Sequence, residues 1–139
     1  MLAEKTMTFA GLNYLAIFVA AVAAFATGAV WYGVLGSRWL AALGKTKEDM
    51  KPTPLPFIIS FIAELVMAFV LAGTIGHMGE VSIRIGIVSA LFVWAGFIAT
   101  TVIVNNAYQG TPWSLPLIDA GHWLAVLIVM GAVIGAFGV

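Results

Sequence analysis

The chain has 139 residues, of which 63% are hydrophobic and only 9% are charged. Ordinary soluble domains contain ~45–50% apolar and ~25% charged residues, because a small domain must cover its core with polar groups. The apolar share corresponds to about 88 residues, which is what four membrane-spanning helices would use. The composition therefore excludes a soluble enzyme, a nucleic-acid-binding domain and a disordered tail, and it predicts an integral membrane protein.

Charge and cysteine content narrow the functional classes further. Six Lys and Arg residues balance six Asp and Glu residues, so no net field attracts nucleic acid or anionic lipid. Cysteine is absent, which excludes disulfides, thiol redox chemistry, iron–sulfur clusters and cysteine-based zinc sites. We therefore expect that the chain binds no nucleic acid and no cofactor. The partner that we expect from the composition is the lipid bilayer around the chain.

Four long apolar runs follow one another along the chain. They cover residues 12–35, 55–76, 85–107 and 117–139. Each run is long enough to cross a hydrocarbon core of ~30 Å as a helix that rises 1.5 Å per residue. Prolines precede the second and fourth runs, at positions where a proline can begin a helix. The sequence predicts an all-α, single-domain bundle of four transmembrane helices joined by short loops.

The loop between the first two runs, residues 36–54, holds half of the twelve charged residues. We expect Ser37 to cap a short separate turn that Gly44 ends, with the apolar residues of that turn at the level of the lipid headgroups. Thr46 followed by Asp49 is a capping-box variant that predicts a second turn. The loop is therefore predicted to include an interfacial segment.

The positions of Lys and Arg predict the orientation in the membrane. The loops that follow the first and third spans share one side, and that side carries four basic residues against two, Lys5 and Arg84, on the other. Because cytoplasmic loops carry the excess of Lys and Arg, we expect loop 36–54 in the cytoplasm and both termini outside. In a bacterium this is the cytoplasmic, or inner, membrane.

Aromatic side chains gather at the same boundary. Five of the eight Trp and Tyr residues fall there: Trp31, Tyr32, Trp39, Tyr108 and Trp113. Such belts anchor helices at the membrane interface. We prefer this anchoring role to a cage of aromatic rings around a ligand.

Small residues recur every four positions along the predicted spans, as they do where membrane helices pack closely. The positions that we expect in such contacts are Ala16, Ala20, Ala24 and Gly28 in the first span and Gly131 and Gly135 in the fourth. The pattern leaves open whether these contacts lie within one chain or between copies.

Ionisable residues inside the spans are the candidates for chemistry. At 1.5 Å per residue, Asp119 lies about 3 Å, His122 about 8 Å and Glu64 about 13 Å from the predicted cytoplasmic boundary. Asp119 and His122 are three residues apart and share a helix face. Asn105 and Asn106 end the third span at the same boundary, and Thr100 and Thr101 lie one to two turns deeper. These groups can form a proton-responsive site.

The alternatives to such a site are structural. Glu64 can be a neutral carboxyl that bonds to another helix, and an ionised one would cost at least ~2.5–3.5 kcal/mol at the bilayer centre. Asp119 can belong to the first turn of the fourth helix, where the helix dipole favours an acid. The two histidines are expected on opposite sides, which excludes a bis-histidine haem, and we expect no metal site and no enzyme activity.

Two segments resemble a known family. They are Gly28-Ala-Val-Trp-Tyr-Gly33 and Asp119-Ala-Gly-His-Trp-Leu124, together with the charged loop and the acid in the second span. These residues resemble the DUF1761 family of small bacterial membrane proteins over essentially the whole chain. The resemblance implies a four-helix membrane protein, and it carries over no catalytic residues because the family has no agreed activity.

The sequence is compatible with two kinds of function. In the first, the chain is a structural or interaction subunit that associates with itself or with a larger membrane complex. In the second, it is a proton-coupled transporter or channel for a small solute, which works as an oligomer through Glu64. Four helices alone rarely enclose a path, so the second function also needs self-association.

Overall fold

The computed structural model describes residues 12–138, and every regular element in this range is helical. Four long rods form an antiparallel bundle. Three of the rods are single helices: α1 Tyr14–Leu43, α2 Leu55–His77 and α5 Ser114–Phe137. The third rod along the chain consists of α3 Ile83–Val93, the π-helical η3 Trp94–Ala99 and α4 Thr100–Gln109. All four rods are long and apolar enough to cross a membrane, so the predicted all-α architecture is confirmed. Lys5 and Val139, which the sequence expectations include, lie outside the described residues.

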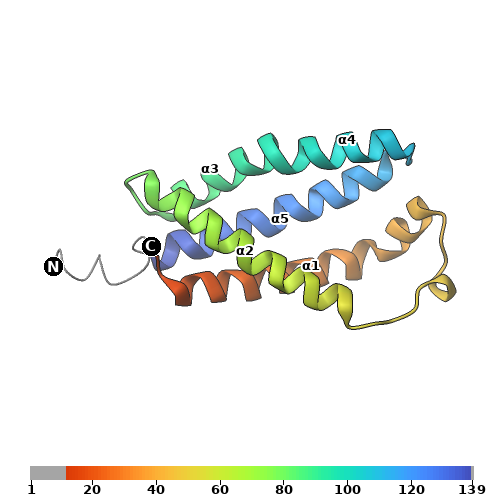
Figure 1. Cartoon of the computed structure of the whole chain (residues 1–139), viewed down its shortest axis with the longest axis horizontal. Coiled ribbons are helices and arrows are strands. Elements are labelled where there is room, and N and C mark those ends of the chain that lie inside the picture. Colours follow the sequence, from red (N-terminus) through yellow and green to blue (C-terminus); the bar gives the residue numbers. More distant parts are fainter. Residues whose placement is uncertain (1–11, 139) are drawn as a thin grey trace.

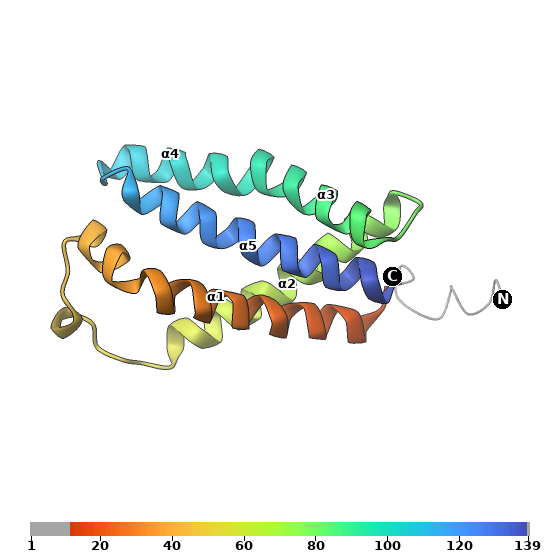
Figure 2. The ribbon, with the colours of Figure 1, turned by 180° about the vertical axis from the view of Figure 1, so that it is seen from behind.

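Helix α5 lies at the centre of the bundle. Figure 1 shows α5 between the α3–α4 rod and α1, while α2 crosses obliquely on one side. Figure 2 shows the same arrangement from behind, with α2 now on the far side. Ten residues of α5 are buried, more than in any other described helix. A helix that is apolar all round belongs in the interior of a bundle.

Glycines bring the backbones of α3 and α5 into direct contact. A side chain on Gly131 would overlap the backbone carbonyl of Gly86, and one on Gly135 would overlap the carbonyl of Ser82. Only glycine fits such positions, as in other membrane-helix pairs that use Gly-x-x-x-Gly. Gly131 and Gly135 therefore pack within this chain, against α3.

The small residues of α1 also face the interior. Ala16, Ala20 and Ala24 are almost completely buried, and Gly28 is buried one turn farther along the same face. Helix α1 packs against both α5 and α2. The second half of α1 leads from this packed face to the charged loop, so α1 connects the core of the bundle with the site described below.

The prediction of a separate turn that begins at Ser37 is wrong, because α1 continues without a break to Leu43. No proline interrupts residues 36–43, and a single glycine at 36 does not end a helix. The helix ends instead at Gly44, whose positive φ of 69° suits glycine and whose N–H donates to the carbonyls of Leu40 and Ala41.

The second predicted turn is confirmed as the short 3-10 helix η2, Lys47–Asp49. Asp49 Oδ2 accepts hydrogen bonds from the backbone N–H of Thr46 at 2.8 Å and from the Thr46 hydroxyl at 3.0 Å. These two bonds favour the ionised carboxylate and hold the pKa of Asp49 below its usual value. The charged loop thus has a defined local structure at the end of the bundle.

Candidate functional site

A cavity of about 850 Å³ opens between the rods at the end of the bundle that carries the charged loop. The walls come from the second half of α1, loop residues 50–53, the start of α2, α4 and the start of α5. Its polar lining side chains include Tyr32, Ser60, Asn105, Asn106, Asp119 and His122. The volume lies within the range of ~300–1,000 Å³ that small-molecule sites usually have.

A hydrogen bond between α1 and α5 lies in the wall of the cavity. The Tyr32 hydroxyl donates to Asp119 Oδ1 at 2.6 Å. Asp119 is the sixth residue of α5, because the helix begins at Ser114, three residues before the expected start of the run. The alternative in which Asp119 lies in the first turn of the helix is therefore wrong. Its carboxylate accepts a hydrogen bond from a side chain of another helix.

His122 lies one turn farther along α5 and packs against α1. Its ring centroid is 4.8 Å from that of Tyr32, and its side chain is only 7% exposed. A Cβ built on Gly28 would come within 2.8 Å of His122 Nε2, which is closer than real Cβ contacts. The imidazole therefore occupies space that exists because residue 28 has no side chain. The other ring nitrogen, Nδ1, is buried without a hydrogen-bond partner.

Two tryptophans hold the turn of α5 that carries Asp119 and His122. Trp31 Nε1 donates to the Ile118 carbonyl at 3.1 Å, and Trp94 Nε1 donates to the Ala120 carbonyl at 2.8 Å. The Trp31 ring lies over Gly121, where an added Cβ would come within 2.8 Å of it. Buried indole N–H groups need such partners. The two bonds fix this part of α5 to α1 and to the π-helical segment.

Glu64 is buried close by but is not joined to the other two acid–base groups. Its side chain is 2% exposed, and Oε2 has no hydrogen-bond partner. The residue lies one turn beyond the cavity-lining Ser60 on the same face of α2, and it is not itself part of the lining. Of the three residues that the sequence singled out, the structure thus brings Asp119 and His122 together with Tyr32 and leaves Glu64 one step deeper.

The threonines expected beside this group are elsewhere. The hydroxyls of Thr100 and Thr101 donate to the carbonyls of Gly96 and Phe97 of their own rod, and both residues are exposed on its outer side. Asn105 and Asn106 do line the cavity. The threonines turn outward because their hydroxyls can bond to the preceding helical turn, which lets them face an apolar surrounding.

The sequence did not single out Tyr32, Trp31 or Trp94 as partners of α5. The first two were assigned to an anchoring belt, but their polar atoms make the contacts across to Ile118 and Asp119. The only available signal was that Trp31 and Tyr32 follow Gly28 in a segment shared with a family. The π-helical turn that carries Trp94 has no sequence signature of its own, although such turns are frequent at functional sites. Among residues 12–138, no three His, Asp or Glu side chains form a group that could hold a metal ion.

The two segments that carry the family resemblance lie against each other in this geometry. A family model described as "Protein of unknown function (DUF1761)" matches residues 15–135. The chain belongs to the DUF1761 family. No curated protein and no solved structure matches the chain. In this DUF1761 protein, residues 28–33 of α1 and 119–124 of α5 form one contact region that borders the cavity, through Gly28, Tyr32, Asp119 and His122.

Proposed function

We propose that this protein is a transporter subunit that binds a small solute in the cavity between α1, α2, α4 and α5. The observation that carries the proposal is the cavity itself, in which a carboxylate, an imidazole and a phenol converge within largely apolar walls. Small-molecule sites have this composition, with a few polar groups placed among apolar ones. The proposal includes no catalytic step.

Glu64 is the proposed coupling group. Because Glu64 Oε2 is buried without a hydrogen-bond partner in the described part of the chain, ionisation of this carboxyl costs more free energy than its neutral form does. Gain or loss of one proton at this position therefore favours one packing of α2 against its neighbours over another. Because Glu64 lies one turn beyond Ser60, such a shift would reach the wall of the cavity directly.

Self-association belongs to the same proposal. The cavity lining ends near Ser60 and His122, and beyond it Ala24, Ala68 and Val126 are fully buried. One chain thus offers a binding site that is closed at its inner end, and moving a solute across the membrane needs either a rearrangement of the bundle or a second copy. A subunit role in a larger membrane complex is the second candidate, since a one-ended site is also what an accessory subunit would use.

We infer that the cavity opens to the cytoplasm of a bacterial cell. It lies at the end of the bundle that carries Arg38, Lys45, Lys47 and Lys51. The excess of basic residues at this end supports a cytoplasmic position for loop 36–54 in the inner membrane. Both termini then lie outside.

The experiment is solute uptake by the purified protein in liposomes with a pH difference across the membrane. A panel of radiolabelled amines, amino acids and organic acids should contain at least one solute whose uptake depends on the protein and on the pH difference. Glu64→Gln should reduce the pH-dependent part at least tenfold while the oligomer stays intact. The matched control is Glu80→Gln, a change of the same chemistry at an exposed position between α2 and α3.

Two results would count against transport. Uptake that is unchanged by Glu64→Gln would show that Glu64 does not couple proton movement to transport. Absence of protein-dependent uptake for every solute, with Glu64→Gln only loosening the oligomer in mild detergent, would favour the subunit role instead.

A further inference from the structure

The Asp119 carboxylate in the cavity has no Lys or Arg partner in the described part of the chain, and the titratable side chain that shares its face of α5 is the buried His122. Within the described residues the Asp119 carboxylate accepts one side-chain hydrogen bond, from the neutral Tyr32 hydroxyl. The only Lys or Arg in the lining is Lys51, which lies in the exposed loop at the opening. An anionic solute inside the cavity would meet this carboxylate, whereas a cationic solute would provide its missing counter-charge.

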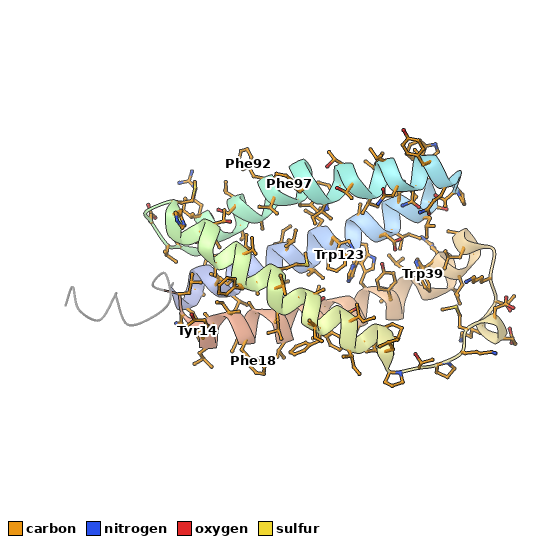
Figure 3. All side chains as sticks on the ribbon, viewed as in Figure 1. Tyr14, Phe18, Trp39, Phe92, Phe97 and Trp123 are labelled. Carbon is orange, nitrogen blue, oxygen red and sulfur yellow. The ribbon has the colours of Figure 1, made fainter. Side chains whose placement is uncertain are left out.

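Aromatic rings surround the same space. Tyr32, Trp39, Phe57 and Trp123 all line the cavity, and the rings of Tyr32 and Trp39 meet edge to face with centroids 5.6 Å apart. In the view of Figure 3, Trp39 and Trp123 lie in the space between the ribbons of α1 and α5. The faces of such rings attract organic cations, most strongly where water is excluded.

One of the amide side chains in the lining is already engaged in hydrogen bonds. The Asn106 amide donates to the Val102 carbonyl at 2.8 Å and accepts from the Thr111 hydroxyl at 2.7 Å, so it is largely occupied. Most of the other lining is aliphatic or aromatic. The walls thus match a solute that combines one positive charge with apolar groups.

We propose that the solute of this cavity is an amphipathic organic cation, held by the Asp119 carboxylate and by the ring faces of Tyr32, Trp39 and Trp123. This inference rests on the proposed function, because it names the substrate class of the same site. The anchoring role that the sequence suggested for Trp39 is then secondary to its place in the cavity wall.

The test is a pair of probes that differ in charge but not in shape. Tetraphenylphosphonium and tetraphenylborate are titrated calorimetrically into the intact protein in mild detergent, with protein-free detergent as the blank. We expect saturable binding of the phosphonium and at least tenfold weaker binding of the borate. Equal binding of the two ions, or tighter binding of the borate, would overturn the proposed substrate class.

Variants locate the binding. Asp119→Asn keeps an oxygen that accepts the Tyr32 hydrogen bond but removes the charge, and it should weaken phosphonium binding at least tenfold. Trp39→Leu, near the end of α1, is a second variant and should weaken phosphonium binding several-fold. Trp113→Leu is its control, because Trp113 is exposed at the same end of the bundle and does not line the cavity. Phosphonium binding that neither Asp119→Asn nor Trp39→Leu weakens would refute the proposed site.

The liposome assay separates the two proposals. Proton-dependent uptake of a neutral or anionic solute, without phosphonium binding, would contradict the cationic substrate and leave transport standing. Phosphonium binding at Asp119 without any protein-dependent uptake would support the binding class and contradict transport.

Discussion

Replacement of Gly28 by alanine tests the contact between α1 and α5 in the wall of the cavity. The added Cβ would lie 2.8 Å from His122 Nε2, so either the imidazole or the helix must move. The imidazole is confined by the Tyr32 ring at 4.8 Å and by the Trp123 ring at 4.6 Å. We therefore expect the helices to separate slightly, rather than the ring to rotate away without cost.

The magnitude follows from two opposing effects. Alanine gains up to ~1 kcal/mol over glycine in the interior of a helix. Overpacking of a tight site costs about 1–3 kcal/mol. Gly33→Ala, on the same helix, obtains the first effect without the second because nothing lies within 4 Å of its added Cβ. The free energy of unfolding of Gly28→Ala should thus be about 1–3 kcal/mol below that of Gly33→Ala.

The assay is reversible unfolding in mixed detergent micelles, measured for both variants with and without His122→Ala. Removal of the imidazole should bring the difference between Gly28→Ala and Gly33→Ala to within ~0.5 kcal/mol, the usual limit of additivity for independent sites. If the two alanine variants have equal stability while His122 is present, the packing described here is refuted. A difference that persists after His122→Ala would show that another neighbour causes it.

Two further perturbations test other contacts. Tyr32→Phe removes the hydrogen bond to Asp119. It should lower the free energy of unfolding by about 1.5–3 kcal/mol, which is usual for a hydrogen bond to a charged group. Tyr108→Phe is the control and should have no effect, because that side chain is 91% exposed. Acidification should break the capping box at Asp49, whose pKa is lowered in the folded chain. The two hydrogen bonds are fully present above the ordinary Asp pKa of about 4, and they are lost as the pH falls through the lowered pKa of the folded state. Amide exchange at Thr46, corrected for intrinsic pH dependence, should become faster over that interval, and a pH-independent rate would contradict the cap.

Hydrophobic length allowed the architecture to be predicted from the sequence. Four apolar runs of membrane-spanning length leave few alternatives to four helices, and the structure has four such rods. The end of α1 was harder to predict, because polar residues at 37 and 38 resemble a loop although nothing breaks the helix before Gly44. Side-chain polarity indicates where the membrane ends, and it does not indicate where a helix ends.

The composition of the site was only partly predictable. The spacing of Asp119 and His122 placed them on one face, but no local pattern revealed that Tyr32 would bond to Asp119. Contacts between α1 and α5 depend on how two distant helices meet, which periodicity within one helix does not determine. The depth estimate placed Glu64 below His122 without showing that its carboxyl lacks a partner.

We propose above that the cavity is open to water at one end and binds a solute there. Because the chain has no cysteine, Ser60→Cys introduces a single thiol into the lining, and Ser89→Cys provides a buried control outside it. Labelling with a membrane-impermeant maleimide is measured in inverted and in right-side-out membrane vesicles. We expect Ser60→Cys to be labelled only in inverted vesicles and to be protected by tetraphenylphosphonium, while Ser89→Cys is not labelled. Failure of Ser60→Cys to react from either side, or labelling that saturating phosphonium does not slow, would contradict it.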